Sequence, residues 1–503
     1  MNLTRKTLPM IAARGVDVPR DGMFELPEKV LQFGTGVLLR ALPDYFIDKA
    51  NRLGVFNGRV VVVKSTAAGS ASAFDDQDGL YTLAIKGIEN GTKVEENIIS
   101  SAISRVLSAS GQWNEILECA SRPEMQIIIS NTTEVGLQLT LEDIYQTPPA
   151  SFPAKLLAFL VVRYDAFKGS PDSGMVIIPT ELIPDNGKKL KAMILELAAF
   201  NKLDQACVNW LTNHNHFCSS LVDRIVPGKP DEQTVSAFKT QFGYDDELLT
   251  ASEVYRLWAI EGDTPIKSIL SFYQADDGVI IAPDIEIYRE LKLRLLNATH
   301  TLSCGAAFLA GFDIVRQGME DEIFFDFVQE LMIDEISEAI PYAIDKNIRT
   351  DFAHKVLDRF RNPSIKHQWL SITLQYSMKL KMRVLPVLQQ HYKNVKHAPQ
   401  DIALGFAAWI LFMRAVKHDG GKYFGERNGI EYPINDDQAA YFHKQWQQHG
   451  EEKVVPAVLE DQSLWGVDLT GLPGFGEAVS KYLNSLLLQG VRNTLRDRKT
   501  IKA

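Results

Sequence analysis

Short apolar runs rich in Val and Ile recur along the first part of the chain, and amphipathic stretches separate them. Continuous runs of this length are typical of strands in a parallel sheet that is covered on both faces. The pattern therefore predicts an α/β domain with a mostly parallel sheet. The predicted strands are KVLQF (29–33), RVVVV (59–63), MQIIIS (125–130), MVIIP (175–179) and GVIIAP (278–283).

The pattern changes near residue 285, where apolar positions begin to recur at helical spacing. The segments 286–311 and 400–416 show this spacing most clearly. We expect an N-terminal α/β domain over residues 1–284 and an all-α C-terminal domain over residues 285–503. The segment 420–437 is dense in Gly, Asn and Asp, and we interpret it as a long surface loop.

Composition narrows the class of protein. The chain has 503 residues, of which 46% are hydrophobic and 23% charged, and a formal net charge of -10. This charge disfavours nucleic acid and anionic membranes as partners, although a local basic pocket would still hold a small anion. The four cysteines are scattered, the longest apolar runs are shorter than the roughly 18 residues of a membrane span, and no secretory signal is visible. We expect a soluble cytoplasmic protein.

A glycine-containing turn follows the first predicted strand, in KVLQFGTGVLLRAL (29–42). A strand, Gly34-x-Gly36 and a helix form the start of a Rossmann-type fold, where a dinucleotide's pyrophosphate meets backbone N–H groups. Leu39 replaces the third glycine of the usual fingerprint, and a tight turn without a ligand has the same sequence. The candidate cofactor-binding residues here are Phe33, Gly34, Thr35, Gly36, Val37 and Leu38.

Polar residues follow three more of the predicted strands. Lys64 ends the second strand, where an Asp or Glu normally holds the ribose of NAD, so NADP is an alternative to NAD. Ligands of open α/β sheets lie beyond the carboxyl ends of the strands, so we expect the polar residues there to lie together. Helix caps and turns are the alternative for each. These residues are Asn131, Thr132, Thr133, Glu134 and Asn186.

The predicted helix after residue 285 carries Lys292, Asn297 and His300 among leucines, in KLRLLNATH. On an α-helix, Asn297 lies about 140° and His300 about 80° round from Lys292, which is within half the circumference. Reduction of a ketone by hydride needs a proton donor and hydrogen bonds to the developing alkoxide, and a desolvated lysine supplies the proton without a metal. An amphipathic helix with a solvated side is the alternative.

Several motifs in order resemble those of the mannitol dehydrogenase family of polyol-specific long-chain dehydrogenases. They are GTGVLLRA (34–41), QDGLYT (77–82), TTEVG (132–136), DNG (185–187), VDRIVP (222–227) and the K-x-x-x-x-N-x-x-H pattern. The segments FCSSLVDRIV, RFRNPSIKHQWLSI and GERNG resemble the branch of this family that acts on keto-hexuronates. The resemblance implies metal-independent reduction of tagaturonate to altronate with NADH, in galacturonate breakdown.

The resemblance also implies roles for individual residues. Lys292 is expected to be the general acid/base, Asn186 and Asn297 to stabilise the oxyanion, and His300 to orient the substrate. Asp223 resembles a substrate contact, and Glu134 a residue beside the catalytic lysine that helps to pass protons. Basic side chains of the RFRNPSIK segment are candidates to hold the substrate carboxylate, with pairing to a neighbouring acid as the alternative. These are Arg359, Arg361 and Lys366.

Other functions are weighed against this one. The same machinery would reduce fructuronate to mannonate, or an uncharged ketose such as fructose. His214, His216 and Cys218 alternate in HNHFC, which on a strand would place them on one face and would suit a zinc-dependent hydrolase or isomerase. Their spacing is not a standard zinc pattern, and we expect no metal. A nucleotide sensor without catalysis is a further alternative, and the oligomeric state is open.

Overall fold

The computed structural model describes residues 1–65, 72–132 and 136–502. The chain divides into two structural units. Unit 1 contains Met1–Gly87 and Lys93–Ile285, and unit 2 contains Ile88–Thr92 and Glu286–Ala503.

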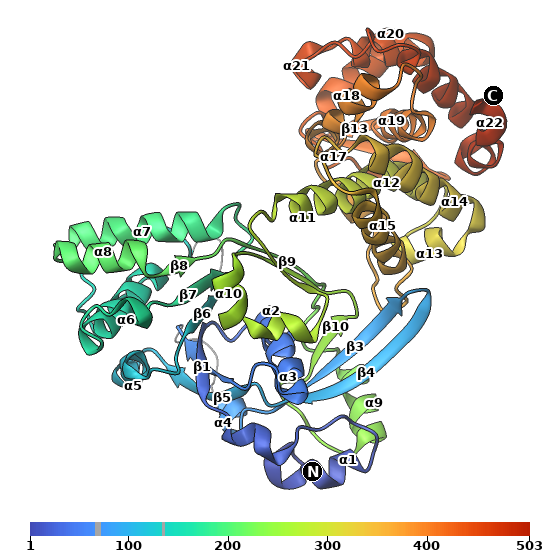
Figure 1. Ribbon diagram of the computed structural model, residues 1–503. Helices are drawn as coiled ribbons and strands as arrows, with labels where there is room; N and C mark the ends of the chain where they lie inside the picture. The colour runs from blue at the N-terminus through green and yellow to red at the C-terminus, as the bar shows by residue number, and fades with distance from the viewer. Residues whose placement is uncertain (66–71, 133–135, 503) are drawn as a thin grey trace. The chain divides into compact units, whose positions relative to one another are not determined.

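A six-stranded sheet forms the centre of unit 1 (Figure 1). Every neighbouring pair of its strands is parallel. When the six strands are numbered in chain order, their spatial order is 3-2-1-4-5-6, which is the strand order of a Rossmann fold. The predicted parallel sheet is therefore confirmed, and four of the five predicted runs lie in it. In spatial order the strands are β5 (Ile103–Ser108), β2 (Arg59–Lys64), β1 (Glu28–Phe33), β6 (Ile127–Ser130), β7 (Val176–Pro179) and β8 (His216–Phe217).

Helices cover both faces of this sheet, which explains why its strands are apolar at every position. Val61 and Val63 pack in one core and Val60 and Val62 in the other, because successive side chains of a strand point to opposite faces. The first core contains α5 (Trp113–Glu118), α6 (Phe152–Ala166), α7 (Asn186–Phe200) and α8 (Gln205–Asn213). The second contains α2 (Val37–Ala41) and α3 (Pro43–Leu53).

The fifth predicted run lies in a different sheet, so its assignment to the parallel sheet was wrong. An apolar run indicates a buried strand but does not specify its partner strand. It forms β12 (Val279–Ala282), beside β11 (Leu257–Glu261) and β9 (Ser220–Asp223). A third sheet contains β10 (Thr250–Glu253), β3 (Tyr81–Glu89) and β4 (Thr92–Ser100). The other helices of the unit are α1 (Leu8–Ala12), α4 (Ser72–Asp76), α9 (Glu232–Phe242) and α10 (Thr264–Ile269).

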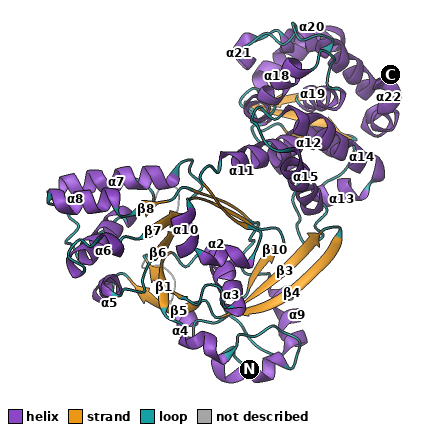
Figure 2. Cartoon of the chain, viewed as in Figure 1, coloured by secondary structure: helices purple, strands orange, loops and turns teal. Residues whose placement is uncertain are grey.

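Unit 2 is mainly helical, as predicted (Figure 2). The apolar helix α19 lies at its centre and packs against α12 and α22. None of the described helices is long and apolar enough to cross a membrane. The helices are α11 (Glu286–Leu291), α12 (Thr299–Leu309), α13 (Val315–Glu320), α14 (Glu322–Glu330), α15 (Lys346–Phe360), α16 (Trp369–Ile372), α17 (Tyr376–Arg383), α18 (Leu385–Asn394), α19 (Gln400–Phe412), α20 (Ala439–Leu459), α21 (Gln462–Trp465) and α22 (Phe475–Lys502).

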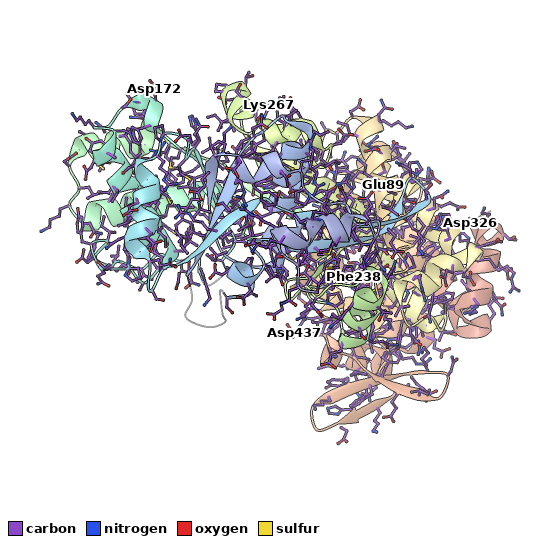
Figure 3. The ribbon with its side chains drawn as sticks, turned by 90° about the horizontal axis from the view of Figure 1, so that it is seen from below. Glu89, Asp172, Phe238, Lys267, Asp326 and Asp437 are labelled. Carbon is purple, nitrogen blue, oxygen red and sulfur yellow. The ribbon has the colours of Figure 1, made fainter. Side chains whose placement is uncertain are left out.

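The segment predicted as a surface loop, 420–437, instead contributes to a small antiparallel sheet. Its strands are β13 (Lys417–Asp419), β14 (Lys422–Arg427) and β15 (Ile430–Pro433). Asn428 and Gly429 both have positive φ. Two such residues form the type of turn that joins two hairpin strands most readily. The segment interpreted as a loop therefore consists largely of two hairpin strands, and its Gly and Asn residues at 420, 421, 428 and 429 lie in the turns. Figure 3 shows this sheet extending from the helices of its unit, with Asp437 after β15.

We predict that Ile128→Ala in the central strand β6 lowers the free energy of unfolding by about 2–5 kcal/mol, because a fully buried side chain leaves a cavity. Leu53→Ala is the control, since Leu53 is 60% exposed. Urea denaturation of both variants measures the difference. Equal effects would contradict the placement of Ile128 in the core.

Candidate active site

The glycine turn lies where the strand order of the parallel sheet reverses, between β1 and β6. Gly34 has a φ of +127°, and a Cβ there would lie 3.0 Å from the carbonyl oxygen of Asn131 and 2.9 Å from Leu39 Cδ1. Only glycine fits this position without strain. A Cβ on Gly36 would meet no described atom within 4 Å, so the space beside the start of α2 is open. This arrangement fits the close approach of a dinucleotide phosphate.

Leu39 takes the place of the third glycine without disturbing this turn. Its side chain is fully buried and packs over Gly34, in the space that a larger residue at position 34 would need. Leu39 therefore fits this turn although the usual fingerprint has a glycine at its position.

The ends of β6 and β7 are joined by a hydrogen-bond network. The Asn131 amide donates to the carbonyl oxygen and the hydroxyl of Thr180, at 3.1 and 3.0 Å. The carboxylate of Glu181 accepts bonds from the backbone N–H of Thr132, at 2.8 Å, and from the hydroxyl of Ser130, at 3.2 Å. Glu181 is only 3% exposed. Thr180 and Glu181 were not predicted as site residues, although their position directly after a buried strand could have indicated them.

Asn186 extends the network to β9 and is fully buried. Its amide donates to the carbonyls of Pro179, Glu181 and Ser220 and accepts from the N–H of Gly187 and Ser220. The side chain therefore fixes the end of β7 against the start of β9. Its contact with a substrate oxygen stays a prediction, since both of its N–H groups are engaged with backbone here.

Gly187, next to Asn186, is required for a separate reason. A Cβ there would lie 2.5 Å from the backbone nitrogen of Ser219, so the start of α7 can pass this segment only with glycine. The Asn-Gly pair is thus neither a simple turn nor a helix cap, since Asp185 occupies the cap position of α7 with a φ of +53°.

The remaining predicted residues of unit 1 lie at other strand ends. Asp223 is the last residue of β9 and is buried, and Lys64 is the half-buried last residue of β2. Thr133 and Glu134 lie outside the described residues. The structure therefore connects Asn131 and Asn186 through Thr180 and Glu181, and Gly34 lies beside the Asn131 carbonyl.

In unit 2, Lys292 and Asn297 lie on a π-helical segment, Lys292–Ala298 (η6), between α11 and α12. Hydrogen bonds in a π-helix run from residue i to residue i+5, so residues five apart lie closer to a common side than they do on an α-helix. The 140° separation expected for an α-helix is therefore wrong. Single π-helical turns inside helices are frequent at functional sites. Both side chains are half-buried.

His300 follows in the first turn of α12 and is held in a cage of aromatic rings. Its ring stacks on Phe360 with centroids 3.9 Å apart, and meets His367 and Trp369 edge-on at 5.3 and 5.7 Å. Burial lowers the pKa of His300 well below its ordinary value, and the nearby His367, Arg359 and Arg383 lower it further. The imidazole is therefore neutral, and its buried Nδ1 has no hydrogen-bond partner among the described residues.

The basic residues proposed to hold a carboxylate differ in their surroundings. Arg359 is half-buried and acts electrostatically on His300. Arg361 and Lys366 are exposed, and the Arg361 guanidinium lies over the ring of Phe325, 5.1 Å from its centroid. The structure thus brings only Arg359 of the three near the ring of His300.

Two cations of α17 near the two imidazoles were not predicted from the sequence: Arg383 acts electrostatically on His300, and Lys379 acts on the neighbouring His367. The η6 segment packs against α15 and α17, so both helices contribute side chains around Asn297 and His300. The spacing of Lys379 and Arg383, four residues apart on one helix face, was the available signal.

The HNHFC segment does not place its histidines and cysteine in a common environment. His214 is half-buried at the end of α8, His216 is exposed, and Cys218 is buried. Burial raises the pKa of the Cys218 thiol to about 12. Among the described residues, no group of three or more His, Cys, Asp or Glu side chains is placed to hold a metal ion.

The strand order and the glycine turn define a Rossmann-type domain, and the matches to known dehydrogenases identify an oxidoreductase that acts on CH–OH groups. The chain belongs to the mannitol dehydrogenase family. The mannitol dehydrogenase Rossmann domain matches residues 28–269, and the mannitol dehydrogenase C-terminal domain matches residues 284–487.

Relatives and solved structures agree with this assignment. Altronate oxidoreductase of Klebsiella pneumoniae (strain 342) is 37% identical and is aligned over 94% of this chain and 97% of its own. Altronate oxidoreductase of Halalkalibacterium halodurans is 36% identical over 94% of this chain and 93% of its own. Two solved structures share the fold. D-sorbitol dehydrogenase has a TM-score of 0.75 at 20% identity, covering 98% of this chain and 100% of its own. Pseudomonas fluorescens mannitol 2-dehydrogenase, in complex with NAD and D-mannitol, has a TM-score of 0.63 at 22% identity, covering 99% and 100%.

We predict that Gly34→Ala lowers the free energy of unfolding by about 1–3 kcal/mol, because alanine is strained at this φ and collides with the Asn131 carbonyl. Gly36→Ala is the matched variant and should leave stability nearly unchanged. Thermal unfolding of both variants measures this. Equal losses would contradict the described conformation of the turn.

We also predict a pH effect from His300. The unfolded chain binds a proton near pH 6.5 and the native imidazole does not, so the stability contributed by neutral His300 is lost as the pH falls below about 6.5. The loss is up to about 1.4 kcal/mol per pH unit. His300→Gln should remove this part of the slope, whereas His367 and His391, whose pKa values are also lowered by burial, keep theirs. Urea unfolding from pH 7 to pH 5 compares the two proteins, and identical slopes would refute a neutral buried His300.

Proposed function

We propose that the protein catalyses the NAD(H)-dependent reduction of D-tagaturonate to D-altronate, and the reverse oxidation, in hexuronate catabolism. The observation that carries this proposal is the similarity to altronate oxidoreductases over nearly the full length of both chains. Lys292 and Asn297 lie toward a common side of the π-helical segment η6, which supports a catalytic role for that segment.

The family and the Rossmann sheet indicate a nicotinamide cofactor. The positive φ of Gly34 and the open space beside Gly36 fit its phosphates. When bound, it supplies hydride to a ketone and accepts hydride from an alcohol. NAD is proposed, and Lys64 in place of an acidic residue makes NADP the alternative to test. The proposed cofactor-binding residues are Phe33, Gly34, Thr35, Gly36, Val37, Leu38, Lys64, Asn131, Thr132 and Thr133.

In unit 2, the proposed chemistry is proton transfer. The Lys292 ammonium donates a proton to the oxygen of the ketone as that oxygen becomes an alkoxide, and in the reverse direction the neutral amine accepts it. The Asn297 amide stands one π-helical turn away and donates a hydrogen bond to the same oxygen. The neutral His300 orients a substrate hydroxyl from its rigid aromatic cage.

Roles are also proposed for residues of unit 1. Asp223, buried at the end of β9, accepts hydrogen bonds from substrate hydroxyls, and Glu134 passes protons to and from Lys292. Asn186 fixes the strand ends and is proposed to assist the oxyanion. Proton transfer through Lys292 needs no metal, so we expect chelator to leave the rate unchanged.

The substrate and cofactor are tested together by following NADH absorbance with tagaturonate, fructuronate and fructose, and then with NADPH. We expect tagaturonate and NADH to give the highest kcat/KM. A higher value with fructuronate would replace the proposed reaction by reduction to mannonate. Binding of NADH without turnover of any substrate would favour a nucleotide sensor instead.

We predict that Lys292→Met lowers kcat for ketone reduction by about 10²- to 10⁴-fold, because the proton donor is lost. Lys381→Met is the control, since Lys381 is an exposed lysine of α17. Steady-state kinetics with matched circular dichroism spectra provide the comparison. A rate near that of the parent for Lys292→Met would remove the catalytic assignment.

A further inference from the structure

Helix α17 buries Tyr376, Ser377 and Leu380, and it also holds two of its three cations partly out of solvent. Met378 and Met382 are 52% and 62% exposed, whereas Lys379 and Arg383 are half-buried. Holding two cations against the rest of the unit costs desolvation free energy, which requires a compensating interaction.

The protein itself supplies only part of that interaction for Arg383. Its Nη1 donates to the hydroxyl of Thr301 at 3.1 Å and to the carbonyl oxygen of Asn297 at 3.5 Å. The guanidinium therefore touches the π-helical segment that carries Lys292 and Asn297. Both bonds use Nη1, and no bond from Nε or Nη2 is made to any described residue. This free edge has the geometry that binds a carboxylate through two parallel hydrogen bonds.

Lys379 is in a similar position one turn earlier on the helix. Its ammonium donates to the carbonyl of Ile372 at 3.0 Å. In the described part of the chain, neither Lys379 nor Arg383 has a carboxylate within the 4.0 Å of an ion pair. Asp436 attracts Lys379 at longer range, but its carboxylate is bound to the backbone N–H groups of Ser377 and Gln438. Each cation therefore retains hydrogen-bonding capacity for a ligand.

The surroundings of this pair favour an anion. Arg359 adds a third positive charge beside His300 and His367, and burial together with these cations lowers the pKa of both imidazoles. His300 is only 8% exposed, and its buried Nδ1 has no hydrogen-bond partner among the described residues. A ligand with hydroxyl groups and a carboxylate would satisfy these atoms together, which neither a neutral ketose nor a cation would do.

We propose that Arg383 and Lys379 bind the carboxylate of the keto-hexuronate, with the guanidinium edge of Arg383 as the main contact. This inference rests on the proposed function and assigns the group that makes the site select uronates over uncharged ketoses. It differs from the expectation based on the RFRNPSIK segment, because Arg361 and Lys366 are exposed.

The test compares substrates that differ only in the charged group. Tagaturonate and fructuronate carry a carboxylate where tagatose and fructose carry CH₂OH. Arg383→Gln should raise the KM for tagaturonate about 10- to 100-fold, the value of a hydrogen-bonded charge, and change the KM for tagatose little. Lys379→Gln should show a smaller loss of the same kind. Lys381→Gln is the control, since Lys381 is an exposed lysine of the same helix, and it should leave the preference unchanged.

The possible outcomes separate this proposal from the proposed function. If the parent enzyme reduces neither uronate, the proposed function fails. If it reduces uronates and Arg383→Gln and Lys379→Gln keep the parent ratio of kcat/KM for tagaturonate over tagatose, the carboxylate site is wrong while the function stands. Should Arg383→Gln not fold, as judged by circular dichroism, Lys379→Gln alone decides, and an unchanged ratio in it overturns the proposal.

Discussion

The π-helical segment at Lys292–Ala298 is the constraint on which the proposed site depends. In a regular α-helix, Lys292 and Asn297 would point about 140° apart. The turn with i to i+5 hydrogen bonds brings the two side chains closer to a common side of the segment. The regular helix α12 follows and carries His300 in its first turn. Such a turn is less favourable than α-helix, so packing against α15 and α17 must hold it. The same two helices bring Arg359, Lys379 and Arg383 to this segment, so the alignment of the proposed acid and the positive charge around it have one structural origin.

In unit 1, the main feature is a set of rigidly held polar strand ends next to an open glycine turn. A continuous hydrogen-bond network links polar side chains to backbone atoms at the ends of β6, β7 and β9. It contains Asn131, Thr180, Glu181 and Asn186. Since an unsatisfied buried polar group is costly, this network fixes the carboxyl edge of the sheet in one arrangement. Gly34 and Gly187 are both needed because backbone passes within about 3 Å of where a side chain would begin. Rigid positioning of this kind is what a cofactor site on a parallel sheet requires.

The sequence predicted the sheet and the grouping of the strand ends because both follow from local patterns. Runs such as RVVVV identify strands buried on both faces, and polar residues directly after them must meet at one edge. It could not place β12 in its own sheet, since an apolar run does not encode its partner. It misjudged the angle between Lys292 and Asn297, because a π-helical turn arises from tertiary packing and has no local signature. Lys379 and Arg383 were overlooked for a similar reason, since their burial depends on which side of α17 the unit covers. The hairpin at Asn428 and Gly429 was missed although its turn residues were visible.

The central claim is that the amine of Lys292 carries the proton as hydride moves. The measurement that tests it most directly is the pH dependence of kcat in both directions, under saturating substrate and cofactor. Reduction needs the ammonium and oxidation the neutral amine, so we predict that the reduction rate falls and the oxidation rate rises with increasing pH. Rates that change in the same direction for reduction and oxidation would contradict the account.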